Sequence, residues 1–279
     1  MNITVCAKQI PDPANEITYD NGLISRPDEQ VLDDTDRYGI EIALQLREKY
    51  DGEVTVISMG PAGTQKGLQQ ALQMGADKTL YVDDDSLKGA NSLMTASILS
   101  ELAKTTDADI VIFGTESTDG YTGTVPQQVA RFLNLDCISY IKAIEISDNV
   151  TLTRQTIEGS EKVTMPEKCV LSVTAGGVEP RYPNFKDIMA AKQKPIEKVE
   201  LSSLNMNASQ NLEFLDIEKI ENSKNGETII IEFFDYNCGY CKRSFPELME
   251  LISENKDIKV ILKELPVLGE SSILASKAA

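Results

Sequence analysis

The stretch DIVIFGTESTDGYTGTVPQQVARFL, residues 109–133, predicts a strand, a loop and a helix in direct succession. Its first five residues form a short β-branched run that is typical of a buried strand. Small residues and glycines fill the loop, and Pro126 suits the first turn of the helix that follows. In an open parallel sheet, ligands bind beyond the carboxyl ends of the strands, so this loop is the first place to look for a site.

The residues before this stretch repeat the same alternation. Short β-branched runs occupy residues 3–7, 53–58 and 78–82, and helical periodicity fills residues 37–49, 67–74 and 91–104. Gly75 is placed to end the second of these helices. The alternation predicts an α/β fold, with a parallel sheet that carries helices on both faces.

From residue 149 onward the pattern changes. Two alternating runs around an E-G-S turn, followed by KCVLSVT, predict a hairpin and a return strand. A proline-rich segment, AGGVEPRYPNFKDIMAAKQKP, comes next and is expected at the surface. The polar segment SSLNMNASQN has neither period and predicts a linker. We therefore expect a domain over residues 1–204, a linker over 205–225 and a second piece over 226–279.

Composition excludes several classes of function. The net charge of −17 repels phosphates, so neither nucleic acid nor an acidic membrane surface is an expected partner. The chain has no histidine, which excludes Ser-His-Asp and Cys-His catalysis and every zinc motif that needs histidine, and no metal site is predicted. No secretory signal is recognisable at the N-terminus, so we expect a cytoplasmic protein in which Cys6, Cys137 and Cys169 are buried thiols.

Residue chemistry leaves two interpretations of the loop at 114–126 open. Its glycines and the N-H groups of the next helix would suit a phosphate, but a polar loop before a capped helix has the same composition. Neither a G-x-G-x-x-G fingerprint after the first strand nor a P-loop motif occurs.

Four motifs in order carry a family resemblance. They are VCAKQIPDP, then SMGPAG with ALQMGADKTLYV, then GTESTDGYTGTVPQQVA, and finally VEPRYPNFKDIMAAKQKPIE. Together, over residues 1–204, they resemble the beta subunit of electron transfer flavoprotein. The resemblance implies an adenine nucleotide alpha hydrolase-like fold and an electron carrier subunit rather than an enzyme. It also implies an alpha subunit with which this chain shares FAD, and AMP or a second FAD on this chain itself.

The resemblance also implies the residues of a nucleotide pocket. By motif position these are Cys6, Ala7, Asp33, Met59, Gly114, Asp119, Gly120, Thr122, Gly123, Thr124 and Val125. For Asp34 and Asp36 we expect a solvated acidic start of a helix instead.

The segment EPRYPNFKDIMAAKQK resembles the family's recognition loop, which docks acyl-CoA dehydrogenases and similar flavoenzymes. Its implied contact residues are Tyr182, Phe185, Ile188 and Met189, with Phe185 where the family usually has leucine. An exposed apolar anchor with basic flanks suits a transient partner. The i, i+3 spacing of Phe185 and Ile188 leaves a second interpretation open, in which both belong to the core side of a short helix.

Residues 227–268 resemble the start of a DsbA-like thioredoxin-fold disulfide oxidoreductase. A C-x-x-C pair at a helix N-terminus makes Cys238 the expected nucleophile and Cys241 the resolving thiol. The family fold continues with a helix and a hairpin for which this sequence leaves no room, so we expect an incomplete thioredoxin-like fragment joined by fusion, rearrangement or assembly error. Thiol-disulfide oxidoreduction is the alternative function.

Overall fold

The computed structural model describes residues 1–15, 18–20, 23–27, 30–61, 63, 65–206, 228–234, 239–254 and 258–264. The chain divides into two units, Met1–Phe214 and Leu215–Ala279. Most of the expected linker, residues 205–225, lies outside the described residues, so its bounds stay a prediction.

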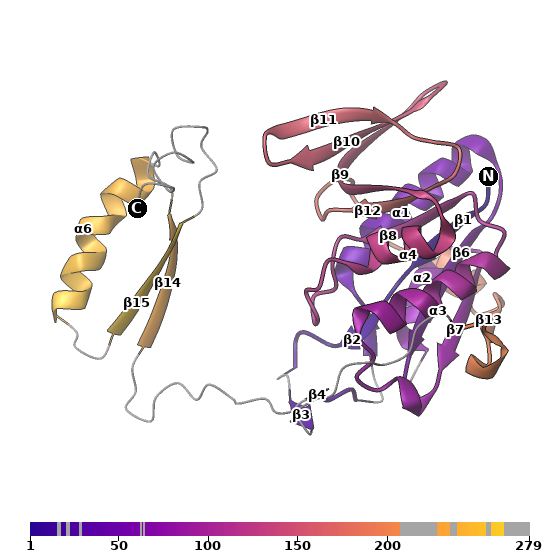
Figure 1. The fold of residues 1–279 in the computed structure, drawn as a ribbon, viewed down its shortest axis with the longest axis horizontal. Helices are drawn as coiled ribbons and strands as arrows, with labels where there is room; N and C mark the ends of the chain where they lie inside the picture. Colours follow the sequence, from indigo (N-terminus) through magenta and orange to yellow (C-terminus); the bar gives the residue numbers. More distant parts are fainter. Residues whose placement is uncertain are drawn as a thin grey trace. The chain divides into compact units, whose positions relative to one another are not determined.

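A sheet with the strand order β11-β10-β9-β12-β8-β1-β6-β7-β13 organises the first unit (Figure 1). Its parallel centre consists of β12 (Cys169–Val173), β8 (Ile110–Gly114), β1 (Ile3–Cys6), β6 (Val54–Gly60) and β7 (Lys78–Asp83). Strands buried on both faces read as continuous apolar runs, which is why these strands were recognisable in the sequence.

Helices cover both faces of this sheet, as the alternation predicted. On one face α1 (Asp34–Tyr50) and α2 (Lys66–Met74) pack, and on the other α3 (Ser92–Thr105) and α4 (Val125–Leu133). The predicted end of α2 is also confirmed, because Gly75 has a φ of 128° and its N-H bonds back to the last turn.

Antiparallel strands extend one edge of the sheet. The predicted hairpin is β10 (Val150–Thr156) with β11 (Gly159–Thr164), and it pairs with β9 (Asp136–Ile146). The sequence analysis missed β9, and it missed β13 (Ile196–Lys198) on the opposite edge. β9 lies between β10 and β12, but exposed polar residues interrupt its apolar pattern. β13 is an edge strand of only three residues, too short to show a pattern.

Short elements complete the unit. The segment between β1 and α1 contains the antiparallel pairs β2 (Gln9–Pro11) with β5 (Gln30–Leu32) and β3 (Tyr19–Asp20) with β4 (Leu23–Ile24). Single turns of 3-10 helix occur at Asp85–Leu87 and Leu201–Ser203, and α5 spans Phe185–Ala191.

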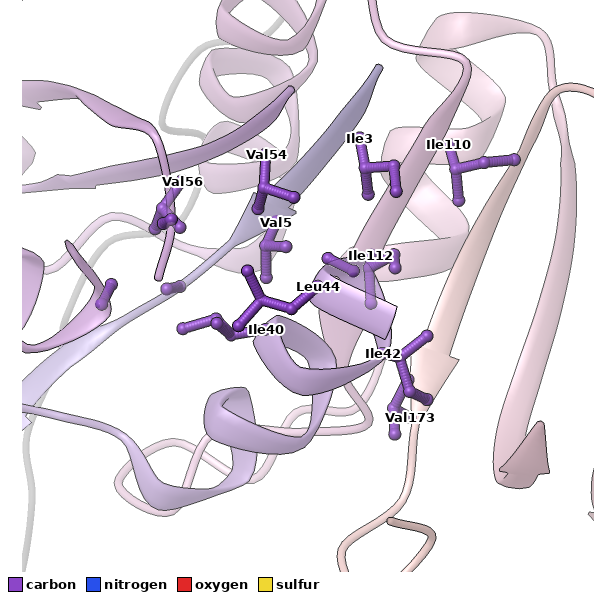
Figure 2. Packing of buried hydrophobic residues seen from close by; sticks show 14 of the residues in the cluster. Ile3, Val5, Ile40, Ile42, Leu44, Val54, Val56, Ile110, Ile112 and Val173 are labelled. Carbon is purple, nitrogen blue, oxygen red and sulfur yellow. The ribbon is translucent and has the colours of Figure 1, made fainter. Parts of the chain in front are cut away.

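The main core lies between α1 and the parallel strands. Figure 2 shows Ile40 and Leu44 of α1 pointing toward Val5 and Ile112, with Ile42 beside Val173. All six of these side chains are buried. Burying one such side chain stabilises the fold by about 1.5–3 kcal/mol, so α1 is fixed to the sheet along much of its length.

The second unit has the predicted order of strand, helix and strand. These are β14 (Thr228–Phe234), α6 (Gly239–Glu254) and β15 (Ile258–Glu264), with β14 and β15 parallel. A parallel strand pair with a crossover helix is how a thioredoxin-like fold begins. None of the helices in the described part of the chain is long and apolar enough to span a bilayer.

We predict that Ile42→Ala lowers the free energy of unfolding by about 2–5 kcal/mol, because it leaves a cavity under α1. Urea unfolding followed by circular dichroism measures the loss. Ile157→Ala is the matched control, since that side chain is 96% exposed and should change stability by less than about 0.5 kcal/mol. Equal losses in the two variants would contradict this view of the core.

Candidate functional site

The connections of the sheet diverge at the carboxyl ends of β1 and β8. After β1 the chain builds β6 and β7 on one side, and it then returns to place β8 on the other side. Such a switch point opens a crevice where ligands of α/β proteins bind. The N-terminus of α1 and the loop after β8 meet at this point.

Asp36 joins the two diverging strand ends. Its Oδ2 accepts a hydrogen bond from the N-H of Lys8 at 2.7 Å, and its Oδ1 accepts one from the N-H of Gly114 at 3.3 Å. The side chain is buried, and burial, followed by the nearby charge of Asp33, raises the pKa of this carboxyl to about 7. The expectation of a solvated Asp36 was therefore wrong.

Asp34 does conform to that expectation. Its side chain is exposed and forms an ion pair with Arg37 at 2.9 Å. The two residues differ because the first turn of α1 directs Asp36 toward the sheet and Asp34 toward solvent.

Asp33 ties the loop after β8 to the start of α1. As the N-cap of α1, its Oδ1 accepts from the N-H of Thr35 at 3.0 Å. Its Oδ2 accepts from the N-H of Thr118 at 2.8 Å and from the hydroxyl of Thr118 at 3.0 Å. One buried carboxylate thus satisfies donors from the start of its own helix and from a residue 85 positions away in the sequence.

Two cations hold Asp119 in the same loop. Lys8 Nζ lies 2.6 Å from its Oδ1, and Arg26 Nη2 lies 2.5 Å from its Oδ2. Burial acts to raise the pKa of the Asp119 carboxyl, but Lys8 and Arg26 outweigh it and hold the pKa below its usual value. Sequence reasoning missed Arg26, because no local pattern connects it with a partner 93 residues away.

The path of the loop depends on its glycines. A Cβ on Gly114 would lie 2.8 Å from Oδ1 of Asp36, so no larger residue fits without displacing that carboxylate. Farther along, Tyr121 and Gly123 have φ values of 49° and 60°, which turn the loop back toward α4. The side chain of Thr124, the N-cap residue of α4, makes no capping hydrogen bond.

The structure brings only some of the predicted site residues together. Four of them lie at the switch point, where hydrogen bonds and ion pairs of these residues or of their chain neighbours connect them: Ala7, Asp33, Gly114 and Asp119. The rest of the loop leads from there to the start of α4 and contains the other predicted residues, Gly120, Thr122, Gly123, Thr124 and Val125. The side chains of Cys6 and Met59 pack in the core below α3 and α4 instead.

The thiols of the first unit are free cysteines. Cys6 and Cys169 are buried as expected, whereas Cys137 is only partly buried. Burial raises the pKa of all three thiols, that of Cys169 to about 12. These thiols are therefore protonated near neutral pH and are poor nucleophiles.

Two cavities differ in how they relate to the switch point. One of about 370 Å³ borders the loop at Thr118 and lies against the N-terminal segment and α1; it is lined by Ile10, Asp12, Pro13, Ala14, Val31, Leu32, Asp34, Arg37, Gln70 and Thr118. A larger one of about 580 Å³ lies near the C-terminal ends of α1 and α2, beside the amino-terminal ends of β6 and β7. We place the candidate site at the carboxyl edge, because topology positions ligands there more reliably than cavity size does.

The segment around α5 presents apolar side chains to solvent. Tyr182 is 86% exposed and Phe185 79% exposed, and Met189 is also exposed. Ile188 is partly buried and Ala191 is buried. The interpretation of Phe185 as a core residue is therefore wrong, and the segment has the exposed anchors that a docking surface needs.

The predicted dithiol falls mostly outside the described residues. Cys238 is among the residues that the structure does not describe, as is the side chain of Cys241, whose backbone lies in the first turn of α6. The roles assigned to these two cysteines stay predictions.

We predict that Asp36 makes stability fall as pH rises through the weakly acidic range. The unfolded carboxyl loses its proton near pH 3.8, whereas the folded one keeps it up to about pH 7. Between pH 5 and 8 the free energy of unfolding therefore falls by about 3 kcal/mol relative to that of a variant with no ionisable group at position 36.

Urea unfolding of the wild type and Asp36→Asn at both pH values measures this difference. Asp34→Asn is the matched control, because it removes the same charge from an exposed position. A parallel pH dependence in the wild type and Asp36→Asn would contradict the prediction.

Comparisons with known proteins agree with this architecture. The family model of the electron transfer flavoprotein domain matches residues 22–204, and that of the DSBA-like thioredoxin domain matches residues 229–278. The electron transfer flavoprotein subunit beta of Mycobacterium tuberculosis is 34% identical over 75% of this chain and 82% of its own length. The corresponding subunit of Bacillus subtilis is 31% identical over 74% of this chain and 81% of its own.

A third relative is the caffeyl-CoA reductase-Etf complex subunit CarD of Acetobacterium woodii, which is 32% identical over 70% of this chain and 77% of its own length. The family model's match over residues 22–204 includes the loop after β8 and the α5 segment together. The resemblance inferred from the four motifs is confirmed, and this chain belongs to the electron transfer flavoprotein family, with the beta subunits as its relatives and a DsbA-like segment after the family domain.

Proposed function

We propose that the first unit binds an adenine nucleotide, AMP or FAD, at the carboxyl edge of β1 and β8. With an alpha subunit it would carry electrons from flavin dehydrogenases. The observation that carries this proposal is the loop of residues 114–125, which Asp33 and Asp36 tie to α1 at the switch point of the sheet. Fixed loops at such a point are the usual cradle for a nucleotide in an α/β fold.

Charge at this edge is compatible with a phosphate. Lys8 and Arg26 together neutralise Asp119, and Asp36 is largely protonated below neutral pH because of its raised pKa. The N-terminus of α4 offers N-H groups that favour an anion. The acidic residues around the loop therefore do not exclude a nucleotide.

This chain would act as an electron carrier subunit, not as an enzyme. The flavin supplies the redox chemistry, and the residues of the chain bind and orient it. Because relatives are named as beta subunits, we infer an alpha subunit as the partner, with FAD shared between the two chains. The reduced, buried thiols of Cys6 and Cys169 are consistent with a cytoplasmic location.

We further propose that the α5 segment docks acyl-CoA dehydrogenases or similar flavoenzymes. Tyr182, Phe185 and Met189 are the exposed apolar residues available for a pocket on such a partner, and Ile188 lies partly buried beside them. Anchors of this kind carry most of the energy of a transient interface.

We predict that Gly114→Ala weakens AMP binding at least about tenfold, because the added methyl group displaces the carboxylate of Asp36 and moves the loop. Calorimetry on the complex with the alpha subunit measures the affinity. Gly60→Ala is the control, since nothing lies within 4 Å of the added atom at this other strand end. Chromatography of the denatured wild-type complex identifies the nucleotide that it releases. A complex that neither releases nor binds an adenine nucleotide would contradict the proposal.

A second candidate function belongs to the DsbA-like segment. The family match over residues 229–278 and the strand-helix-strand order of the second unit favour thiol-disulfide exchange at Cys238 and Cys241. If this function is present, the full chain reduces insulin in the presence of dithiothreitol faster than dithiothreitol alone, and Cys238→Ser abolishes the acceleration. Cys137→Ser is the control, and an acceleration that survives Cys238→Ser would exclude the dithiol as its source.

A further inference from the structure

One face of α1 carries a polar stripe at helical spacing. Glu41, Gln45 and Glu48 stand at positions i, i+4 and i+7, so their side chains share one side of the helix. The side chain of Glu41 is only 5% exposed. A carboxylate that is buried this deeply needs charged or hydrogen-bonding partners.

Arg181 supplies most of these partners from a distant part of the sequence. Its Nε and Nη2 donate to the two oxygens of Glu41 at 2.7 and 3.0 Å, and its backbone N-H adds a bond of 3.2 Å. Its Nη1 lies 2.6 Å from Glu48 Oε1. Gln45 completes the set with a bond of 2.8 Å to Glu41. The guanidinium is thus held by both carboxylates of the stripe.

Lys194 fixes the other end of the same segment. Its Nζ donates to the carbonyl oxygens of Ala76 at 2.6 Å and Gly75 at 3.4 Å, where α2 ends. A cation is favourable at the C-terminal end of a helix. The segment therefore has one polar anchor on α1 and another on α2.

Between these anchors the segment has little apolar burial of its own. The seven residues of α5 are too few for a helix that is stable in isolation, and Ala191 is the one buried residue among them. Its position on the molecule therefore depends on the anchors, and most of all on Arg181, which meets the buried carboxylate.

We propose that Arg181 is the positioning residue of the docking segment, with Lys194 as its second anchor. The Arg181 fork on Glu41 and Glu48 holds residues 182–192 in the orientation that presents Tyr182, Phe185 and Met189 together. This inference rests on the proposed docking function. Removing the fork lets the segment leave its docking position, and the apparent affinity for a partner falls by the fraction of molecules that leave it.

Hydrogen exchange on the complex with the alpha subunit tests the positioning role without a docking partner. Arg181→Gln should raise the exchange rates of amides in residues 184–194 at least about fivefold and leave those of β1 and β8 unchanged. Arg181→Lys keeps the charge but loses the planar fork, so it should give an intermediate increase. Arg131→Gln is the matched control, because Arg131 is exposed on α4, across the sheet.

Electron transfer from a purified acyl-CoA dehydrogenase tests the consequence for docking. Arg181→Gln should raise the KM for the complex about tenfold with kcat within about twofold, because docking weakens while the flavin is unchanged. Lys192→Gln, which removes an exposed charge in the segment, separates steering from positioning; its effect should vanish at high salt, and that of Arg181→Gln should not.

Each outcome decides between the proposals. Unchanged hydrogen exchange in both Arg181 variants would overturn the positioning role. The same conclusion would follow if Arg181→Gln sped up exchange but left KM unchanged, while Phe185→Ala raised KM. A KM that responds to neither Phe185→Ala nor Arg181→Gln would overturn the docking function itself, and the positioning role with it. If Arg181→Gln does not fold, Lys194→Met and Arg181→Lys give the same comparison.

Discussion

The carboxylate of Asp36 is the contact on which the site depends. It accepts hydrogen bonds from the N-H groups of Lys8, just after β1, and Gly114, at the end of β8. These are the two strands at whose carboxyl ends the connections of the sheet diverge. Backbone N-H groups at strand ends need acceptors when they are buried. Asp36 supplies that acceptor from the first turn of α1, and the resulting contact leaves no room for a side chain on Gly114.

Helix α1 connects the two surfaces to which we assign functions. Asp33 and Asp36 in its first turns organise the loop at the carboxyl edge, and Glu41 and Glu48 farther along meet Arg181. The apolar face of the helix, with Ile40 and Leu44, packs on the sheet between these points (Figure 2). Because interiors are close-packed, the helix is a rigid element on which both segments are built.

Much of the fold could be predicted from local patterns. The β-branched runs at β1, β6, β7 and β8 were recognisable because central parallel strands are buried on both faces. β9 and β13 were not, since exposed polar residues interrupt the pattern of β9 and β13 is an edge strand of only three residues. In the site, the loop glycines stood out by composition, but the burial of Asp36 and the pairing of Arg26 with Asp119 did not.

The sequence by itself determined the order of the central strands and their helices, the family and the loop at which to look for a nucleotide. These depend on residue type and spacing over short ranges, which the chain displays directly. Only the tertiary structure decided which carboxylates are buried and which cations meet them, because Arg26 and Asp119 lie 93 residues apart in the sequence and Glu41 and Arg181 lie 140 apart. Their charges interact only after the sheet has brought those segments to the same helix or the same edge.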